Sequence, residues 1–243
     1  MHGGPETVGR EGTLAPGSVR RVAIVGPGLD FTNKTDGYDY YPLQTIQPFA
    51  LVNTLRRTGL AAADLRVTTL DVNARVNEHL RNAVSRAASA PGYVLTLPLD
   101  GDEAWTESLL SYWKDWGSLI GNQVTAAPPP AAAGTVKSRA VQIQREVVSS
   151  VTARDLNIVV DRLRGRDDER FGLVVATNVL VYYDVFEQAL AAANVAAMLR
   201  PGGIFMTNTA IFPTPQLRGS ASYLRVNHTA QRYDDVFWYQ RER

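Results

Sequence analysis

The sequence contains no cysteine and only three histidines, His2, His79 and His228. The absence of cysteine excludes disulfide bonds, thiolate nucleophiles and cysteine-ligated metals. So few histidines also argue against a histidine-rich metal site, and we expect no bound metal. A chain without cysteine fits a reducing compartment, which leads us to expect a cytoplasmic protein.

The sequence also has no excess of positive or negative charge. Lys and Arg number 25 against 24 Asp and Glu, so the net charge is +1. Because no global field favours a polyanion, we expect no nucleic-acid partner. No apolar run approaches ~20 residues, so we also expect no membrane span. Partners must be inferred from local motifs.

The length and composition suffice for one domain with insertions. The chain has 243 residues, of which 45% are hydrophobic, and this allows a sizeable core. Residues 1–18 are rich in glycine and polar side chains and are expected to form a flexible tail. We expect a single domain over residues 19–243, with insertions near 32–47 and 92–147.

The first half of this domain alternates between strand and helix patterns. The run RVAIVG (21–26) is typical of a buried parallel strand, and Pro48 and Gly59 bracket a helix at 47–58. A second strand is predicted at 65–73 and a second helix at 74–89. This order predicts a right-handed parallel α/β arrangement.

The middle of the chain is less regular. GYVLTLPL (92–99) is predicted to be a strand, and TAAPPPAAAG (125–134) an exposed loop. An apolar stripe at helical spacing is interpreted as core packing; its members are Trp105, Leu109, Trp113, Trp116 and Ile120.

The order returns after residue 147. A strand is predicted to turn into a helix near residues 155–157, followed by a buried strand from 171, a helix at 185–199, a tight turn at 201–203 and a strand at 203–210. The segments 222–231 and 234–242 are predicted to form an antiparallel pair that closes the sheet.

Two features point to a ligand at the carboxyl ends of the strands. Gly26 and Gly28 follow the first strand, where glycine lets backbone approach a ligand. Asp71 stands where the second strand should end and could accept hydrogen bonds from both ribose hydroxyls. Phe31 occupies the third glycine position of a dinucleotide fingerprint, which weakens that interpretation.

Together with these features, five motifs resemble those of class I S-adenosylmethionine-dependent methyltransferases. They are VAIVGPGLD, Asp71, Asp155-Leu156-Asn157, LVVATNVLVYYD and MLRPGGIFMTN. The resemblance implies a Rossmann-like, seven-stranded, mostly parallel sheet with a C-terminal antiparallel hairpin, and S-adenosylmethionine as cofactor. It assigns cofactor binding to Gly26, Pro27, Gly28, Asp30, Asp71, Val72, Asp155, Leu156, Asn157 and Asn178.

The glycine loop departs from the family pattern. Ile24 stands where the family usually has an acid, and Asp30 where it has a third glycine. Asp30 is a candidate substitute acid for the cofactor's ammonium group. Asn178 is a polar amide that emerges from a buried strand, which is hard to explain by packing.

The candidate catalytic residues are tyrosines. Tyr38 and Tyr40 lie in the insert after the first strand, and Tyr183 follows the fourth-strand motif. Aromatic faces attract a sulfonium cation, and a loop at a strand end can serve as a lid over the acceptor. The alternative for the insert is a surface loop packed by its own aromatic rings. His228 is interpreted as a structural histidine.

These observations predict a methyltransferase that acts on an oxygen, nitrogen or carbon nucleophile of a small-molecule substrate. Two alternatives stay open. The segment TNVLVYYD (177–184) is similar to its counterpart in chemotaxis-receptor methyltransferases, which suggests protein side-chain methylation. A catalytically inactive module that binds S-adenosylmethionine is the other.

Overall fold

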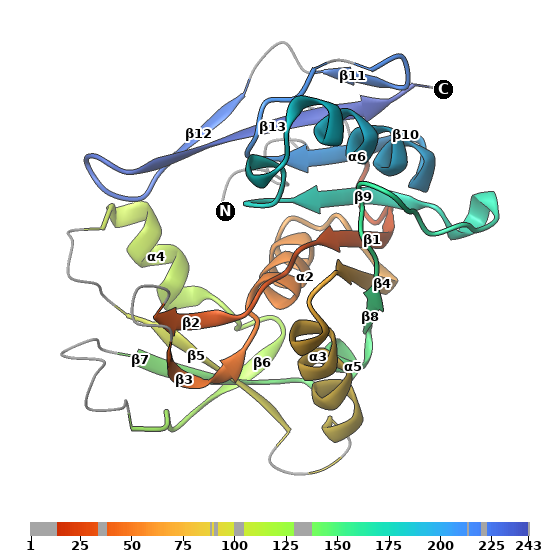
Figure 1. The fold of residues 1–243 in the computed structure, drawn as a ribbon. Coiled ribbons are helices and arrows are strands. Elements are labelled where there is room, and N and C mark those ends of the chain that lie inside the picture. Colours follow the sequence, from red (N-terminus) through yellow and green to blue (C-terminus); the bar gives the residue numbers. More distant parts are fainter. Residues whose placement is uncertain are drawn as a thin grey trace.

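The structure is a computed structural model that describes residues 14–33, 38–87, 89, 92–99, 105–128, 138–212, 214–219 and 223–242, with the backbone alone at 31–33, 38–42 and 98. Its central sheet has the strand order β11-β13-β10-β9-β1-β4-β8, and β12 pairs with β13 outside that path. Helices and further strands surround this sheet (Figure 1).

Five neighbouring strands of the sheet are parallel. They are β1 (Val19–Val25), β4 (Ala61–Asp71), β8 (Val151–Asp155), β9 (Phe171–Ala176) and β10 (Leu199–Thr207). All six residues of β9 are buried, as expected for a strand covered on both faces. When these five strands are numbered by their order along the chain, they lie in the sheet in the order 3-2-1-4-5, which is typical of doubly wound folds. The predicted Rossmann-like sheet is therefore confirmed.

The C-terminal end of the sheet is antiparallel. β13 (Tyr233–Arg241) runs antiparallel to β10, and it pairs with both β11 (Leu217–Gly219) and β12 (Leu224–Asn227). β12 pairs with the first part of β13 and β11 with its end. The predicted C-terminal hairpin is confirmed as β12–β13, and the seven strands of the path become eight with β12.

Helices cover both faces of the sheet. On one face, Val22 and Ile24 of β1 share a core cluster with residues of α2 (Gln47–Arg57), α3 (Ala74–Arg86) and α5 (Arg145–Ser149). On the other face, Ala23 and Val25 share a cluster with α6 (Val185–Met198). The alternation of β1 side chains thus divides the core into two layers.

The insertion forms a second, smaller sheet. β5 (Tyr93–Pro98), β7 (Ser138–Ile143) and β6 (Gly121–Val124) pair antiparallel, with α4 (Glu107–Asp115) beside them. Trp116 is 1% exposed and belongs to the same cluster as α2, so the tryptophan stripe contributes to the core. A hairpin of β2 (Asp30–Asn33) and β3 (Tyr38–Gln44) lies next to this sheet (Figure 1).

The insertion and the C-terminal hairpin meet at the carboxyl side of the main sheet. The backbone N–H of Thr106, at the start of α4, donates to the carbonyl of His228 over 2.9 Å. Figure 1 shows α4 below the loop that joins β12 to β13, on the side to which β1 and β9 point. His228 itself pairs with Asp234 at 2.8 Å, which fits a structural histidine.

Three expectations about the elements are corrected. Leu14 is only 2% exposed, so the described end of the predicted tail is packed on the domain. The helix predicted after residues 155–157 is a turn, in which Leu156 and Ile158 cover the sheet in its place. The predicted turn at 201–203 is an irregularity within β10, where the register with β9 shifts and Gly202 has φ 75°.

None of the described helices is long and apolar enough to cross a membrane. Within the described ranges, no group of three or more histidine or acidic side chains could hold a metal ion.

Candidate functional site

The chain reverses its winding direction between β1 and β9. From β1 it proceeds to β4 and β8 on one side, and it then returns to β9 and β10 on the other. The connections after β1 and β9 therefore lead to α2 and α6 on opposite faces of the sheet, and open α/β sheets bind ligands at the carboxyl ends of the strands at such a point. Most predicted site residues lie at or just after the ends of β1, β4, β8 and β9, whereas Asp30, Tyr38 and Tyr40 belong to β2 and β3.

The two glycines after β1 differ in their surroundings. Gly26 and Gly28 have φ of 62° and 68°, which L side chains rarely adopt. A Cβ on Gly26 would lie 2.5 Å from Cγ2 of Val179, so Gly26 allows the loops after β1 and β9 to touch. A Cβ on Gly28 would meet nothing within 4 Å. Gly28 is therefore the glycine that borders open space.

Asp71 joins the ends of β1 and β4. Its Oδ1 accepts a hydrogen bond from the backbone N–H of Asn73 at 2.8 Å, and the backbone N–H groups of Gly28 and Val72 lie near enough to lower its pKa. Partial burial nevertheless raises the pKa of Asp71 above its usual value, and these N–H groups counter only part of that effect. Val72, the next residue, is 66% exposed beside it.

The carboxylate of Asp155, at the end of β8, is held by two side chains of α3. Nδ2 of Asn77 donates to Oδ1 of Asp155 at 2.6 Å and to the carbonyl of Asp71 at 2.9 Å. Arg81 pairs with Oδ2 of Asp155, and these contacts lower the pKa of Asp155. Asn77 thus connects the ends of β4 and β8, and Arg81 holds the carboxylate of Asp155 from the same helix.

The two residues after Asp155 form part of the turn. Leu156 is 7% exposed, and its backbone N–H donates to the carbonyl of Asp71 at 3.2 Å. Oδ1 of Asn157 accepts from the backbone N–H of Val159 at 3.0 Å. Leu156 therefore presents its backbone beside Asp71, whereas Asn157 stabilises the turn.

Asn178 has an unusual backbone conformation at the end of β9. Its φ is 58°, and no other residue apart from glycine has a positive φ in the described part of the chain. Its backbone N–H donates to Oδ1 of Asn208 at 2.8 Å, and Nδ2 of Asn208 donates to Oδ1 of Asn178 at 2.6 Å. The preceding residue, Thr177, accepts a hydrogen bond from Nε2 of Gln47 at 2.8 Å.

The two tyrosines after β9 have different environments. Tyr182 is 77% exposed, whereas Tyr183 is half-buried and packs against the core cluster of α6. Burial raises the pKa of Tyr183, and the negative charges of Glu187 and Asp71 raise it further.

The hairpin after the glycine loop is fixed at its base. The carboxylate of Asp30 accepts from the backbone N–H of Ile46, just before α2, and Oγ1 of Thr45 donates to the carbonyl of Pro27 at 3.4 Å. The backbone of Tyr38 and Tyr40 belongs to β3. The side chains of these two tyrosines lie outside the described part of the structure.

The structure thus gathers most predicted site residues along one edge of the sheet. Gly28 and Val72 lie close enough to Asp71 to affect its pKa, and the carbonyl of Asp71 accepts from the backbone N–H of Leu156. Sequence reasoning missed Asn77, Arg81 and Asn208. Asn77 and Arg81 are spaced i and i+4, which places them on one side of α3, and this signal could have identified them once Asp155 was assigned to the adjacent strand.

Comparison with known proteins gives matches among solved structures alone. No protein-family model matches the sequence, and no curated protein sequence matches it. The N-methyltransferase NodS from Bradyrhizobium japonicum WM9 is 14% identical, with 100% of both chains covered and a TM-score of 0.44.

Two further solved structures are similar to the chain in the same way. A TehB-like SAM-dependent methyltransferase from Corynebacterium glutamicum is 8% identical, with 98% of this chain and 87% of that one covered and a TM-score of 0.44. Magnesium protoporphyrin IX methyltransferase from Synechocystis, solved with bound SAM, is 9% identical, with 97% and 74% covered and a TM-score of 0.43. Because these sequence identities and TM-scores are low, the fold is assigned from the strand order of this chain. The function has to be argued from its own residues.

Proposed function

We propose that the protein is an S-adenosylmethionine-dependent methyltransferase that acts on an oxygen, nitrogen or carbon nucleophile of a small molecule. The observation that carries the proposal is the position of Gly28 and Asp71 at the neighbouring ends of β1 and β4, where the winding of the sheet reverses. An open glycine turn after the first strand and a carboxylate after the second are the two features that an adenosine ligand requires there.

The residues at this edge fit such a ligand. The absence of any atom within 4 Å of a Cβ built on Gly28 leaves room for the ligand beside the backbone. Asp71 has two carboxylate oxygens that can accept hydrogen bonds from ribose hydroxyls. Val72, 66% exposed, offers an apolar surface of the kind that a flat base covers. The backbone N–H and carbonyl groups around Leu156 supply polar contacts at its edge.

The bound cofactor would supply a methyl group on a sulfonium, and its transfer is an in-line displacement. The protein then needs to align the acceptor, exclude water and, for some acceptors, remove a proton. The ordinary pKa of a tyrosine hydroxyl is 10.0 and burial raises that of Tyr183 further, so this hydroxyl is protonated at neutral pH and is available as a hydrogen-bond donor. Tyr38 and Tyr40 remain the candidates for contact with the acceptor.

A small-molecule acceptor is supported by how the strand ends are covered. Thr106 of the insertion is hydrogen-bonded to the C-terminal hairpin, and the β2–β3 hairpin leaves directly from the glycine loop. Segments on both sides of the crevice therefore extend past the sheet. Such cover excludes water from a small pocket, whereas a protein side chain would need an open approach.

Calorimetry with S-adenosylmethionine and S-adenosylhomocysteine tests the cofactor, and detection of S-adenosylhomocysteine release from pools of small molecules tests transfer. We expect binding by the wild-type protein and none by Gly28→Val, in which a branched side chain occupies the ligand space. Normal binding by Gly28→Val would mean that the loop is only a turn. Binding without release on any small-molecule or protein pool would favour an inactive module, and release on protein pools alone would favour protein methylation.

A further inference from the structure

The two faces of the central sheet are covered unequally. α2, α3 and α5 pack on one face and α6 on the other (Figure 1). In the part of the chain that the structure describes, the connections from β8 to β9 and from β10 to β11 contain no α-helix. Among the described elements, α6 therefore provides the α-helical cover of this face by itself.

The outer side of α6 is not polar. The sequence of the helix, VFEQALAAANVAAM, contains one charged residue, Glu187. A helix that is apolar on all sides is normally buried on all sides. The outer side of α6 is nevertheless open, because Val185 is 60% exposed and Phe186 is 71% exposed. This mismatch indicates that another apolar surface covers the helix.

The polar side chains at the start of α6 turn back onto the backbone of the chain. Oδ1 of Asp184 accepts from the backbone N–H of Glu187 at 2.8 Å, and the carboxylate of Glu187 accepts from the backbone N–H of Asp184 at 3.0 Å. Nε2 of Gln188 donates to the carbonyls of Leu180 and Tyr183, both at 3.0 Å. These contacts leave the outward surface to apolar side chains.

The exposed side chains of α6 form one stripe along the helix. Val185, Ala189 and Ala193 follow one another at intervals of four residues, as do Phe186 and Leu190. Residues four apart lie on the same side of a helix, so the two rows are neighbours. We call these five residues the α6 stripe.

The stripe and the turn before it expose enough apolar surface for a stable contact. Phe186 is 71% exposed, and Tyr182, just before the helix, is 77% exposed. Because an aromatic side chain buries about 150–250 Å² when it is fully covered, these two rings leave roughly 200–350 Å² accessible. With Val181, Val185 and Leu190, at 38–61%, the total reaches roughly 300–550 Å². Each side of a standard interface contributes about 800 Å², somewhat more than half of it apolar. The exposed area is therefore in the range of the apolar share of one such interface.

The two ends of α6 carry opposite charges. Asp184 and Glu187 lie at its start. Near its end, Nδ2 of Asn194 donates to the carbonyl of Val159 at 3.1 Å, and Oδ1 of Asn194 accepts from the guanidinium of Arg162 at 3.2 Å. The positive charge of Arg162 therefore lies beside the second half of the helix.

We infer that the α6 stripe packs against the α6 stripe of a second copy of this chain, with the two helices antiparallel and a two-fold axis near Ala189. The antiparallel arrangement brings the acidic start of each helix to the basic second half of the other, so the face is complementary to itself. A centre without charges is typical of permanent homodimers, whereas transient partners use more polar surfaces. The inference does not depend on the proposed methyl transfer.

The lack of cysteine allows a direct test of this geometry. In Ala189→Cys the introduced thiol is the only one in the chain, and near the two-fold axis it faces its own copy. A disulfide requires Cα atoms within about 7 Å of each other. We expect diamide, a two-electron oxidant, to cross-link Ala189→Cys into dimers quickly, and to cross-link Leu119→Cys only at the rate of random collision.

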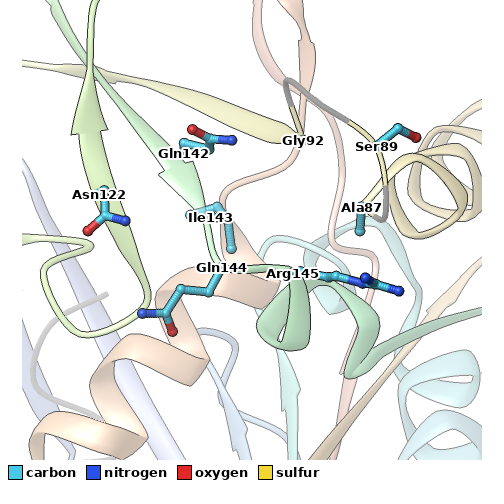
Figure 2. A pocket seen from close by; sticks show the side chains of 8 residues that line it. All are labelled: Ala87, Ser89, Gly92, Asn122, Gln142, Ile143, Gln144 and Arg145. Carbon is cyan, nitrogen blue, oxygen red and sulfur yellow. The ribbon is translucent and has the colours of Figure 1, made fainter.

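Leu119 provides the matched control. It lies in the insertion, shortly before β6, where Asn122 lines a hollow. Figure 2 shows that this hollow also takes polar side chains from Gln142, Gln144 and Arg145, in contrast to the apolar stripe. Leu119 is 44% exposed and Leu190 is 38% exposed. A glutamate should therefore be tolerated equally well by either monomer, but only Leu190→Glu places a charge in the inferred interface.

Sedimentation equilibrium without any cofactor measures the association. At micromolar concentrations, we expect the wild type and Leu119→Glu to have twice the chain mass of 26.6 kDa. Leu190→Glu and Phe186→Glu should each raise the dissociation constant about tenfold or more, because they bury an unpaired charge. Arg162→Glu should also weaken the dimer, most strongly at low ionic strength. Circular dichroism verifies that each variant is folded.

Several results would overturn the inference. One is a monomeric wild type, and a variant without residues 1–13 that dimerises in its place would assign the face to that segment. Another is equal association of the wild type, Leu190→Glu and Phe186→Glu. Cross-linking of Ala189→Cys no faster than that of Leu119→Cys, or unchanged association of Arg162→Glu at low ionic strength, would reject the antiparallel contact. Each failure would leave the methyl-transfer proposal unaffected, because no cofactor takes part.

Discussion

Asn178 and Asn208 hold each other through two hydrogen bonds across the carboxyl ends of β9 and β10. Asn208 accepts from the backbone of Asn178 at 2.8 Å and donates to its side chain at 2.6 Å. Asn178 has φ 58°, a conformation that costs a non-glycine residue roughly 1–2 kcal/mol. The reciprocal pair offsets this cost and fixes the loop that faces Gly26.

We predict that Asn208→Ala lowers the free energy of unfolding by about 1–2 kcal/mol, because it removes both hydrogen bonds of the pair. Urea denaturation measures this change. Asn178→Gly and Asn178→Ala serve as a matched comparison, since both keep the backbone donor but only glycine adopts the positive φ without strain. The alanine variant should be the less stable of the two. Equal stability would show that the backbone conformation contributes nothing.

The two glycines of the first loop should respond differently to alanine. Gly26→Ala places a Cβ against Val179 and should cost about 3 kcal/mol of stability, from strain and overpacking together. Gly28→Ala meets no atom and should cost only about 1 kcal/mol, but it should weaken binding of S-adenosylhomocysteine. Denaturation and calorimetry measure the two effects.

A double variant checks the contact itself. Val179→Ala removes the methyl group that a Cβ on Gly26 would meet, so it should restore part of the stability lost in Gly26→Ala. If the two substitutions are additive, the close approach of the loops does not explain the need for glycine at position 26.

Sequence patterns predicted the central sheet because its strands are continuous apolar runs. FGLVVA is buried at every position in β9, and β4 ends at Asp71 as its pattern indicated. The region after Asp155 misled the prediction, because Leu156, Val159 and Leu163 have the apolar spacing of a helix, i, i+3 and i+7. In the structure Leu156 and Ile158 cover the sheet from a short turn, so tertiary packing overrides the local pattern.

The polar contacts of the site were harder to predict for a physical reason. Asp71, Asn77 and Asp155 come together only through the parallel pairing of β4 with β8, which the sequence does not specify residue by residue. Asn208 likewise meets Asn178 only because β10 lies next to β9. Contacts between the ends of different strands depend on the register of the sheet. A glycine turn or the end of a single strand, in contrast, can be recognised from a short sequence pattern.

Substitution of Asp71 should leave the free energy of unfolding at pH 7 unchanged or raise it, but should weaken cofactor binding. Because burial raises its pKa above the ordinary 3.8, the folded protein holds a proton at this carboxyl more tightly than the unfolded chain does. The contribution of Asp71 to stability is therefore greatest at low pH, and it falls as pH rises from the ordinary value through the raised one. We expect Asp71→Asn to be at least as stable as the wild type at pH 7 and to lack this part of the pH dependence.

The same carboxylate should be needed for the cofactor. Asp71→Ala should weaken binding of S-adenosylmethionine by about 1.5–3 kcal/mol, the cost of losing hydrogen bonds to a charged acceptor. Calorimetry measures the affinity, and circular dichroism verifies that the variant is folded. Unchanged affinity in a folded variant would reject the ribose assignment.

The base of the hairpin after the glycine loop is anchored to the small sheet. Gln44 is buried and exchanges two hydrogen bonds of 2.8 Å with the backbone of Thr96, while Thr45 donates to Tyr93. Residues 44–46 therefore belong to the fixed part of the fold. Any lid in the predicted segment 32–47 must be confined to the residues before Gln44.

We predict that hydrogen exchange detects this division. Peptides that cover residues 44–47 should be protected in every state, because their backbone groups are buried or hydrogen-bonded. Peptides that cover residues 30–43 should gain protection when S-adenosylhomocysteine binds, since a lid closes over an occupied site. Tyr38→Phe and Tyr40→Phe should lower the turnover of whichever acceptor the methyl-transfer assay identifies, whereas Tyr182→Phe, at a side chain that is 77% exposed, should not. Equal exchange of residues 30–43 in all states, together with normal turnover by both lid variants, would assign these tyrosines to packing.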